Sequence, residues 1–235
     1  MKTKPLVALL LIASAVAGST EIHAKDLAAQ TVHPLDRKIS ELTARIAENP
    51  KDAVAYNGRG NAWFKKGQYR KAIADYEAAF RLAPDFAIPY KNRAVAFARL
   101  GLHDKPSDSA SKAIAINPKY TGTYYTRGLA SLRLKNYQAA IADFDIVLKR
   151  KPDFADAVLS RGNAWTGLKL YDKALAEYDR TIELKPRYGR PWYNRGIVLD
   201  RKGDRKGAIA SFRKALEVQP AHFGARRALR LRGAL

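Results

Sequence analysis

Prolines recur at a fixed interval of 34 residues along most of this 235-residue chain. They stand at Pro50, Pro84, Pro118, Pro152, Pro186 and Pro220. A period of this length indicates a repeat architecture, in which each repeat is one helical hairpin that cannot bury its apolar face alone. Neighbouring hairpins must stack, so function has to be sought on the surface that the stack presents.

The frame runs without an insertion from residue 53 to residue 222. It divides into units one to five, which span 53–86, 87–120, 121–154, 155–188 and 189–222. Small residues at the eighth and twentieth positions let two helices approach closely, and large residues at positions four, eleven and twenty-four fill the space beside them. The proline stops the second helix before the next unit begins. The pattern therefore predicts an all-α solenoid.

Unit two departs from this pattern. Pro106 stands where the other units have alanine, and Ala110 stands where they have an aromatic residue. We expect looser packing there. Elsewhere the breaks between the two helices of a unit are predicted at Gly67, Gly101 and Gly203.

Both ends of the repeat frame are predicted to carry a capping helix. Residues 35–50 have apolar side chains at three- and four-residue spacing, which is typical of a helix. Residues 223–235 leave the frame, because Arg230 stands where a small residue is expected, and they form a basic cap. A helix lying on a membrane surface is the alternative for this segment.

The N-terminus has the features of a secretory signal. Lysines precede a short apolar run at residues 6–13, and an Ala-Val-Ala sequence ends at Ala17. We predict a signal peptide at 1–17, with Ala24 as an alternative end, and a linker at 18–34. A membrane anchor is the other interpretation, but the run is shorter than the ~20 residues of a spanning helix. We expect export, to the periplasm or else by secretion, with no transmembrane span after cleavage.

The repeat pattern resembles the tetratricopeptide repeat (TPR) family, in the variant with Arg-Gly at positions seven and eight that is common in bacteria. The resemblance covers residues 53–222. It implies antiparallel helix pairs stacked into a right-handed superhelix with a concave groove. It also implies that the groove binds a protein or peptide and that the chain is not an enzyme.

The seventh position is arginine in every unit, where the family usually has leucine. An arginine so near the helix interface needs a partner, because a stranded charge is costly. Acids at position twenty-three lie 18 residues before an arginine, which predicts a structural charge ladder between units: Glu41–Arg59, Asp75–Arg93, Asp143–Arg161 and Glu177–Arg195. Pairing within a unit is the competing arrangement. Arginines that line the groove and bind a ligand carboxylate are the functional alternative.

The resemblance places the groove on positions two, five, nine, twelve and thirteen of each first helix. The candidate binding residues there are Asn57, Asn61, Lys65, Lys91, Arg99, Tyr125, Leu129, Arg133, Asn163, Tyr193 and Arg201. Position thirteen is basic in every unit except at Gly167. These basic residues either bind a ligand or are solvated helix ends that complement the helix dipole. The family's carboxylate clamp is not supported, because Asn57, Gly122 and Thr126 replace three of its residues.

The formal net charge of +21 implies an anionic partner. The four histidines have no metal-ligand spacing, no catalytic or nucleotide-binding motif occurs, and the chain has no cysteine. We therefore expect no cofactor and no metal. Export argues against nucleic acid. The first hypothesis is an exported scaffold for a protein or peptide with acidic and apolar residues. The alternative is an electrostatic binder of acidic polysaccharide, lipopolysaccharide or acidic lipid.

Overall fold

A computed structural model describes residues 33–102 and 104–235, with only the backbone of residues 104–106. These residues form twelve helices and no strand, which confirms the predicted all-α solenoid. No helix in these ranges has the length and apolar character needed to cross a membrane. The predicted signal peptide and nearly all of the predicted linker lie outside the described residues.

The helices form pairs between two single terminal helices. The first is α2 (Pro34–Glu48), and the last is α13 (Phe223–Arg230). The pairs are α3 (Ala53–Lys65) with α4 (Tyr69–Leu82), α5 (Ala87–Arg99) with α6 (Asp104–Ile116), α7 (Thr121–Arg133) with α8 (Tyr137–Arg150), α9 (Ala155–Gly167) with α10 (Tyr171–Leu184), and α11 (Gly189–Arg201) with α12 (Arg205–Val218). Each pair begins at the first residue of a predicted unit.

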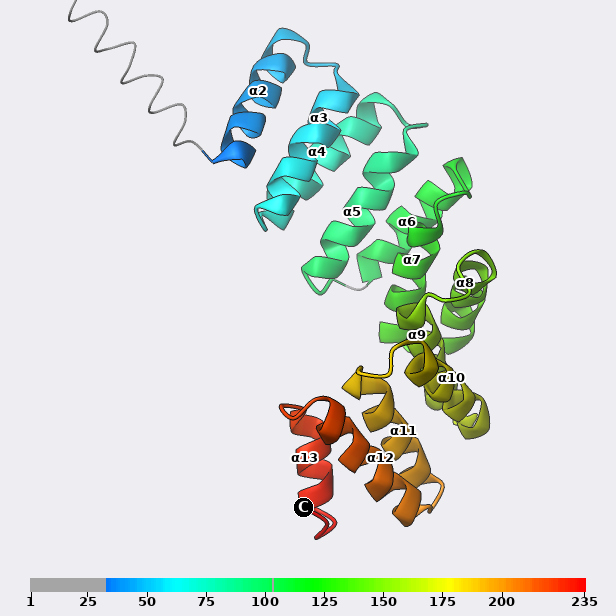
Figure 1. Ribbon diagram of the computed structural model, residues 1–235. Helices are drawn as coiled ribbons and strands as arrows, with labels where there is room; N and C mark the ends of the chain where they lie inside the picture. Colours follow the sequence, from blue (N-terminus) through cyan, green and yellow to red (C-terminus); the bar gives the residue numbers. More distant parts are fainter. Residues whose placement is uncertain (1–32, 103) are drawn as a thin grey trace, which may run out of the picture.

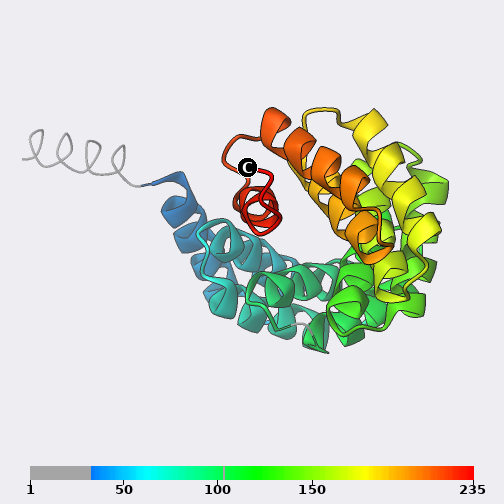
Figure 2. The ribbon, with the colours of Figure 1, turned by 90° about the horizontal axis from the view of Figure 1, so that it is seen from below.

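The pairs follow one another along an arc (Figure 1), and the stack curves round through much of a ring (Figure 2). Each helix packs on the next one in the chain, and the first helices of successive units also contact one another, from α3 to α5, α7, α9 and α11. Helices are more closely spaced on the inner side of a curved stack. The first helices therefore form the concave face.

A large side chain from the second helix packs on a glycine of the first helix in most units. A Cβ atom at Gly128 would lie 2.8 Å from Cε1 of Phe144, so only glycine fits. Unit two has Ala94 facing Ala110 instead, and both side chains are fully buried. In unit two, alanine replaces both the glycine of the first helix and the larger aromatic residue of the second helix. The predicted looser packing of this unit rested partly on Pro106, whose side chain is not described.

The two helices of each unit are separated by a residue in the left-handed backbone region. The predicted glycine breaks have φ values of 75° at Gly67, 74° at Gly101 and 85° at Gly203. In units three and four the same position is Lys135, with φ 63°, and Lys169, with φ 61°. This conformation costs a residue with a Cβ atom about 1–2 kcal/mol. Packing of the flanking helices therefore holds these two lysines in place.

The terminal helices cover the ends of the stack. In α2, Ile39, Leu42 and Ile46 are buried. In α13, Leu229 is buried in a cluster with Phe212 of α12. Just beyond α13, Arg232 donates to both carboxylate oxygens of Asp200 in α11, at 2.5 and 3.0 Å.

Candidate ligand-binding groove

An arginine ladder runs through the stack, but its pairs differ from those predicted. In units one, three, four and five, the arginine bonds to position twenty-three of its own unit, 16 residues ahead. The contacts are Arg59 with Asp75 at 2.7 Å, Arg127 with Asp143 at 2.7 Å, Arg161 with Glu177 at 2.6 Å, and Arg195 with the Ser211 hydroxyl at 2.8 Å.

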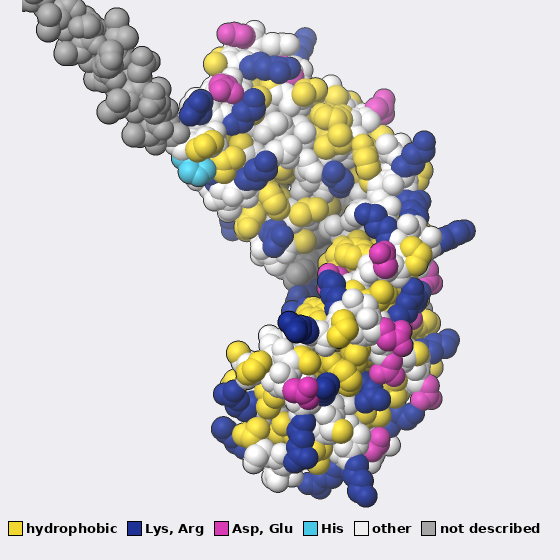
Figure 3. Space-filling model, viewed as in Figure 1, with side chains coloured by type: hydrophobic (Ala, Val, Ile, Leu, Met, Phe, Trp, Pro, Cys, Tyr) yellow, Lys and Arg dark blue, Asp and Glu magenta, His cyan; other side chains and the backbone are white. Residues whose placement is uncertain are grey.

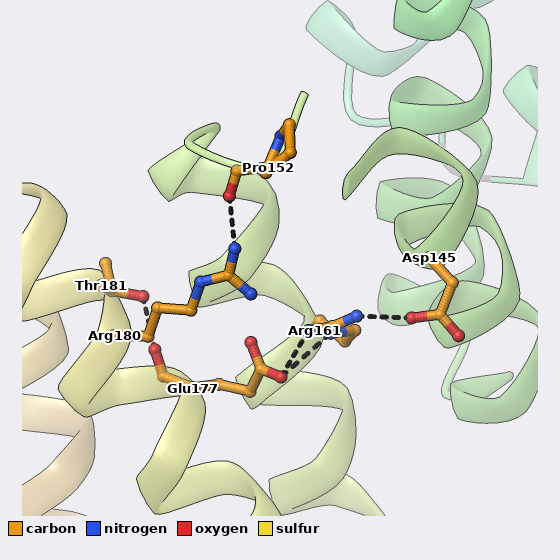
Figure 4. A network of polar contacts seen from close by, with 6 residues as sticks. All are labelled: Asp145, Pro152, Arg161, Glu177, Arg180 and Thr181. Carbon is orange, nitrogen blue, oxygen red and sulfur yellow. Dashed lines mark hydrogen bonds and ion pairs between the residues drawn. The ribbon is translucent and has the colours of Figure 1, made fainter. Parts of the chain in front are cut away.

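The arginines of all five units also reach back 16 residues, to position twenty-five of the preceding unit or, for Arg59, to the corresponding residue of α2. The ion pairs are Arg93–Glu77 at 3.2 Å, Arg161–Asp145 at 2.6 Å and Arg195–Asp179 at 2.8 Å, while Arg59 and Arg127 donate to the hydroxyls of Thr43 and Ser111 at 3.2 Å. Figure 4 shows Arg161 between Asp145 and Glu177.

The predicted pairing at 18-residue spacing was wrong because it placed the acids on the wrong face of the second helix. Residues two positions apart on a helix point in nearly opposite directions. Position twenty-three faces its own unit, and position twenty-five faces the next one. Glu41, predicted as the first acid of the ladder, instead pairs with Lys38 on its own helix at 3.3 Å.

The ladder arginines are paired within the protein. The hydrogen bond to Asp75 raises the pKa of Arg59, and the bond to Asp143 raises the pKa of Arg127. Burial lowers the pKa of Arg161, but the combined effect of Asp145 and Glu177 in raising it is larger, so the pKa is raised overall. Because acids or hydroxyls of the protein hold them, these arginines are not placed to bind a ligand carboxylate.

Two asparagines and a tyrosine form a hydrogen-bonded cluster on the concave face, which we call the N-terminal amide site. Asn61 Oδ1 accepts from Tyr76 Oη at 2.9 Å and from Asn92 Nδ2 at 2.9 Å. Asn92 Nδ2 also donates to Asn57 Oδ1 at 3.1 Å. A cavity of about 320 Å³ lies over this cluster and is lined by Asn61, Phe64, Tyr76, Lys91, Asn92, Val95 and Gly122.

A second cluster, the C-terminal amide site, has a similar arrangement between units four and five, with Leu159 in place of Asn57. Asn163 Oδ1 accepts from Tyr178 Oη at 3.0 Å and from Asn194 Nδ2 at 2.8 Å. Burial raises the pKa of Tyr178 to about 12. The cavity here is about 350 Å³ and is lined by Asn163, Thr166, Tyr178, Tyr193, Asn194, Ile197 and Arg201.

Two predicted groove residues of unit three are partly packed into the core. The Tyr125 ring lies 4.9 Å from the Phe154 ring, and burial raises the pKa of Tyr125. Leu129 packs against a cluster that includes Ile141 and Phe144. Both side chains keep part of their surface exposed, between the two amide sites along the chain.

The basic residues at position thirteen are exposed at the ends of the first helices. Lys65, Arg99, Arg133 and Arg201 are each the last residue of their helix. Of these, Arg201 lines one of the amide-site cavities, and Lys65, Arg99 and Arg133 do not. The interruption at Gly167 has a structural cause, because a Cβ atom there would collide with the Tyr137 ring. On the face seen in Figure 3, Lys and Arg side chains are spread along the stack with hydrophobic side chains between them.

Sequence reasoning treated Tyr76 and Tyr178 as core residues and missed the hydrogen bonds of their hydroxyls. A signal was present in the repeat alignment. Position twenty-four is tyrosine in the two units that have asparagine at position nine, and it is phenylalanine in units three and five, which have Leu129 and Ile197 there. The hydroxyl thus occurs where an amide accepts it. No group of three or more His, Asp or Glu residues suited to a metal occurs in the described part of the chain.

Comparisons with known proteins identify the repeat. Three family models described as "Tetratricopeptide repeat" match residues 53–86, 125–189 and 189–222. No curated protein matches the chain.

Solved structures share the fold. YrrB, described as a TPR protein with an unusual peptide-binding site, is 22% identical with a TM-score of 0.71, over 80% of this chain and 97% of its own. MamA is 26% identical with a TM-score of 0.67, over 72% of this chain and 92% of its own. A TPR protein from Parabacteroides merdae ATCC 43184 is 21% identical with a TM-score of 0.71, over 85% of this chain and 80% of its own.

Proposed function

This chain belongs to the tetratricopeptide repeat family, and on that premise we propose that it is an exported, non-enzymatic scaffold. It binds an extended segment of another protein in its concave groove. The export half of this proposal is supported by the N-terminal sequence, with its lysines, short apolar run and Ala-Val-Ala site. The peptide-binding site described for YrrB, which has a similar fold, supports the binding half.

The hydrogen-bond pattern of the N-terminal amide site carries the proposal. Asn61 Oδ1 already accepts two hydrogen bonds, which uses both of its lone pairs and leaves the Nδ2 donors for a ligand. Asn92 Nδ2 already donates twice, which leaves its Oδ1 acceptor. The pair therefore offers one donor group and one acceptor to the groove. A peptide group, with its C=O and N–H, has the complementary pair.

The side chains around the amides indicate the composition of the bound segment. Lys91 and Arg201 supply positive charge, and Val95, Tyr193 and Ile197 supply apolar surface. A segment with acidic and apolar side chains matches this lining. Its backbone bonds to the asparagines, and its acidic residues contact the cations.

The test is selection of peptides from a random display library on the purified protein. We expect the selected peptides to keep part of their binding at about 0.5 M salt, where exposed charge pairs are screened. Binding should be lost in the double variant Asn61→Leu with Asn163→Leu. Leucine is the residue of unit three at this position, so the stack tolerates it. The control is Asn117→Ala, in a turn where Asn117 accepts from the Lys119 backbone N–H.

Heparin serves as the probe for the alternative, in which the protein binds anionic polymers by charge alone. If salt abolishes all binding, if heparin competes fully, and if the double variant binds like wild type, then the protein is an electrostatic binder and the groove proposal fails.

A further inference from the structure

The two amide sites occupy corresponding positions at a distance of three repeats. Six lining residues of the first cavity have a counterpart in the second that is 102 residues later: Asn61 and Asn163, Phe64 and Thr166, Tyr76 and Tyr178, Lys91 and Tyr193, Asn92 and Asn194, and Val95 and Ile197. Asn61, Tyr76 and Asn92, which make the two hydrogen bonds common to both sites, are identical in type to their counterparts, whereas Asn57, which accepts a third bond in the first site, is replaced by Leu159. The lengths of the two common bonds agree within 0.1 Å.

Other residues and contacts recur at the same offset. The same offset relates Pro89 to Pro191, Arg99 to Arg201 and Gly122 to Gly224. It also relates two cation–π contacts, in which Lys71 lies 4.4 Å from the Trp63 ring centroid and Lys173 lies 4.6 Å from that of Trp165. These features of units one and two therefore recur in units four and five, with unit three between them.

The distance between the sites follows from helix packing. The first helices of successive units contact one another, and packed helices lie about 8–10 Å apart. Three such steps separate the sites by about 24–30 Å. An extended chain advances about 3.3 Å per residue, so about eight residues cover this distance.

From these observations we propose that the groove binds one extended segment at two points, one peptide group at each amide site, about eight residues apart. This inference rests on the proposed function and adds the length and spacing of the ligand. Between the two points the segment passes unit three, where Tyr125 and Leu129 replace the amides with apolar surface. The bound segment thus has polar backbone contacts at its two ends and apolar side chains in its middle. Two short segments that bind independently are the competing arrangement.

The probe is the tightest peptide of about 12 residues from the display library, together with its two halves of about six residues, each too short at about 20 Å to reach both sites. Titration calorimetry gives affinity and stoichiometry for wild type, Asn61→Leu and Asn163→Leu. We expect the full peptide to bind one to one, and each half to bind at least about 100-fold more weakly, because the second contact of a linked ligand is intramolecular. Each single variant should weaken the full peptide about 100-fold. Each half should respond to only one of the two variants.

A second pair of variants guards against a general loss of folding. Tyr76→Phe and Tyr178→Phe carry the residue that units three and five have at this position, and they remove only the hydroxyl that orients the asparagine. Each should reproduce the loss caused by the asparagine variant of the same site, with an unchanged circular dichroism spectrum.

Three results would overturn the inference alone: two peptides bound per chain, halves that bind as tightly as the full peptide, or a full peptide that ignores one of the two asparagines. A library that yields no binding peptide would instead contradict the proposed function, and the inference with it.

Discussion

Asp143 and Asp145 lie two residues apart on α8 and bind arginines of different units. Asp143 is 3% exposed and holds two nitrogens of Arg127, in its own unit, at 2.7 and 2.9 Å. Asp145 has a side chain that is 55% exposed and holds Arg161 of the next unit. The two carboxylates should therefore contribute differently to the free energy of unfolding, because one is buried and the other is largely solvated.

Asp143→Ala should lower the free energy of unfolding by about 3 kcal/mol, because it leaves Arg127 partly buried without its carboxylate. Asp145→Ala should lower it by at most about 1 kcal/mol, since an exposed ion pair contributes little. Urea denaturation of the two variants measures the difference. Equal effects would show that burial does not set the strength of these contacts.

At the scale of the helices, proline and glycine spacing predicted where most of them begin and end. The breaks at Lys135 and Lys169 carried no such signal, because tertiary packing imposes a backbone conformation that lysine alone does not favour. The partners of the ladder were also not predictable. They depend on how the second helix is rotated between two neighbours, and a 34-residue period leaves this rotation open. The asparagines were predicted as groove residues, but the tyrosine hydroxyls were not, because an aromatic residue at a buried position is ordinarily a core residue.

The C-terminal helix should lose stability in mild acid. His222 caps α13, with Nδ1 accepting from the Ala225 N–H at 3.2 Å, and its ring lies 4.9 Å from that of Tyr193. Burial lowers the pKa of His222 below its usual 6.5, and the positive charge of Arg190 lowers it further. The unfolded chain therefore binds the proton more readily than the native one. The stabilisation is complete above about pH 6.5 and declines as the pH falls from there through the native pKa.

Hydrogen exchange of the α13 amides at pH 8 and pH 5 measures this effect. Protonation removes the cap acceptor, so we expect a loss of about 1 kcal/mol of local protection at pH 5. His222→Asn, which caps without titrating in this range, should show no such change. Equal pH dependence in both proteins would exclude the histidine as the cause.

The whole molecule is a stack in which each unit contacts chiefly its neighbours, so its stability is set junction by junction. A chain that lacks residues 121–154 should therefore still fold. The deletion brings Arg161 opposite Ser111, whose hydroxyl accepts a hydrogen bond from Arg127 in the full chain. Circular dichroism should give an unchanged helical signal per residue, and small-angle scattering should show a smaller maximum dimension. A chain that unfolds would show that the junctions are not interchangeable.

The arginine contacts also differ in strength from one junction between units to the next. Between units, Arg161 and Arg195 donate hydrogen bonds to carboxylates of the preceding unit and Arg93 forms an ion pair with one, whereas Arg127 donates only to the Ser111 hydroxyl. Hydrogen bonds to a charged acceptor are roughly twice as strong as neutral ones. When the solenoid is pulled from its two ends, the junction between units two and three should therefore open at a lower force than the other junctions between units.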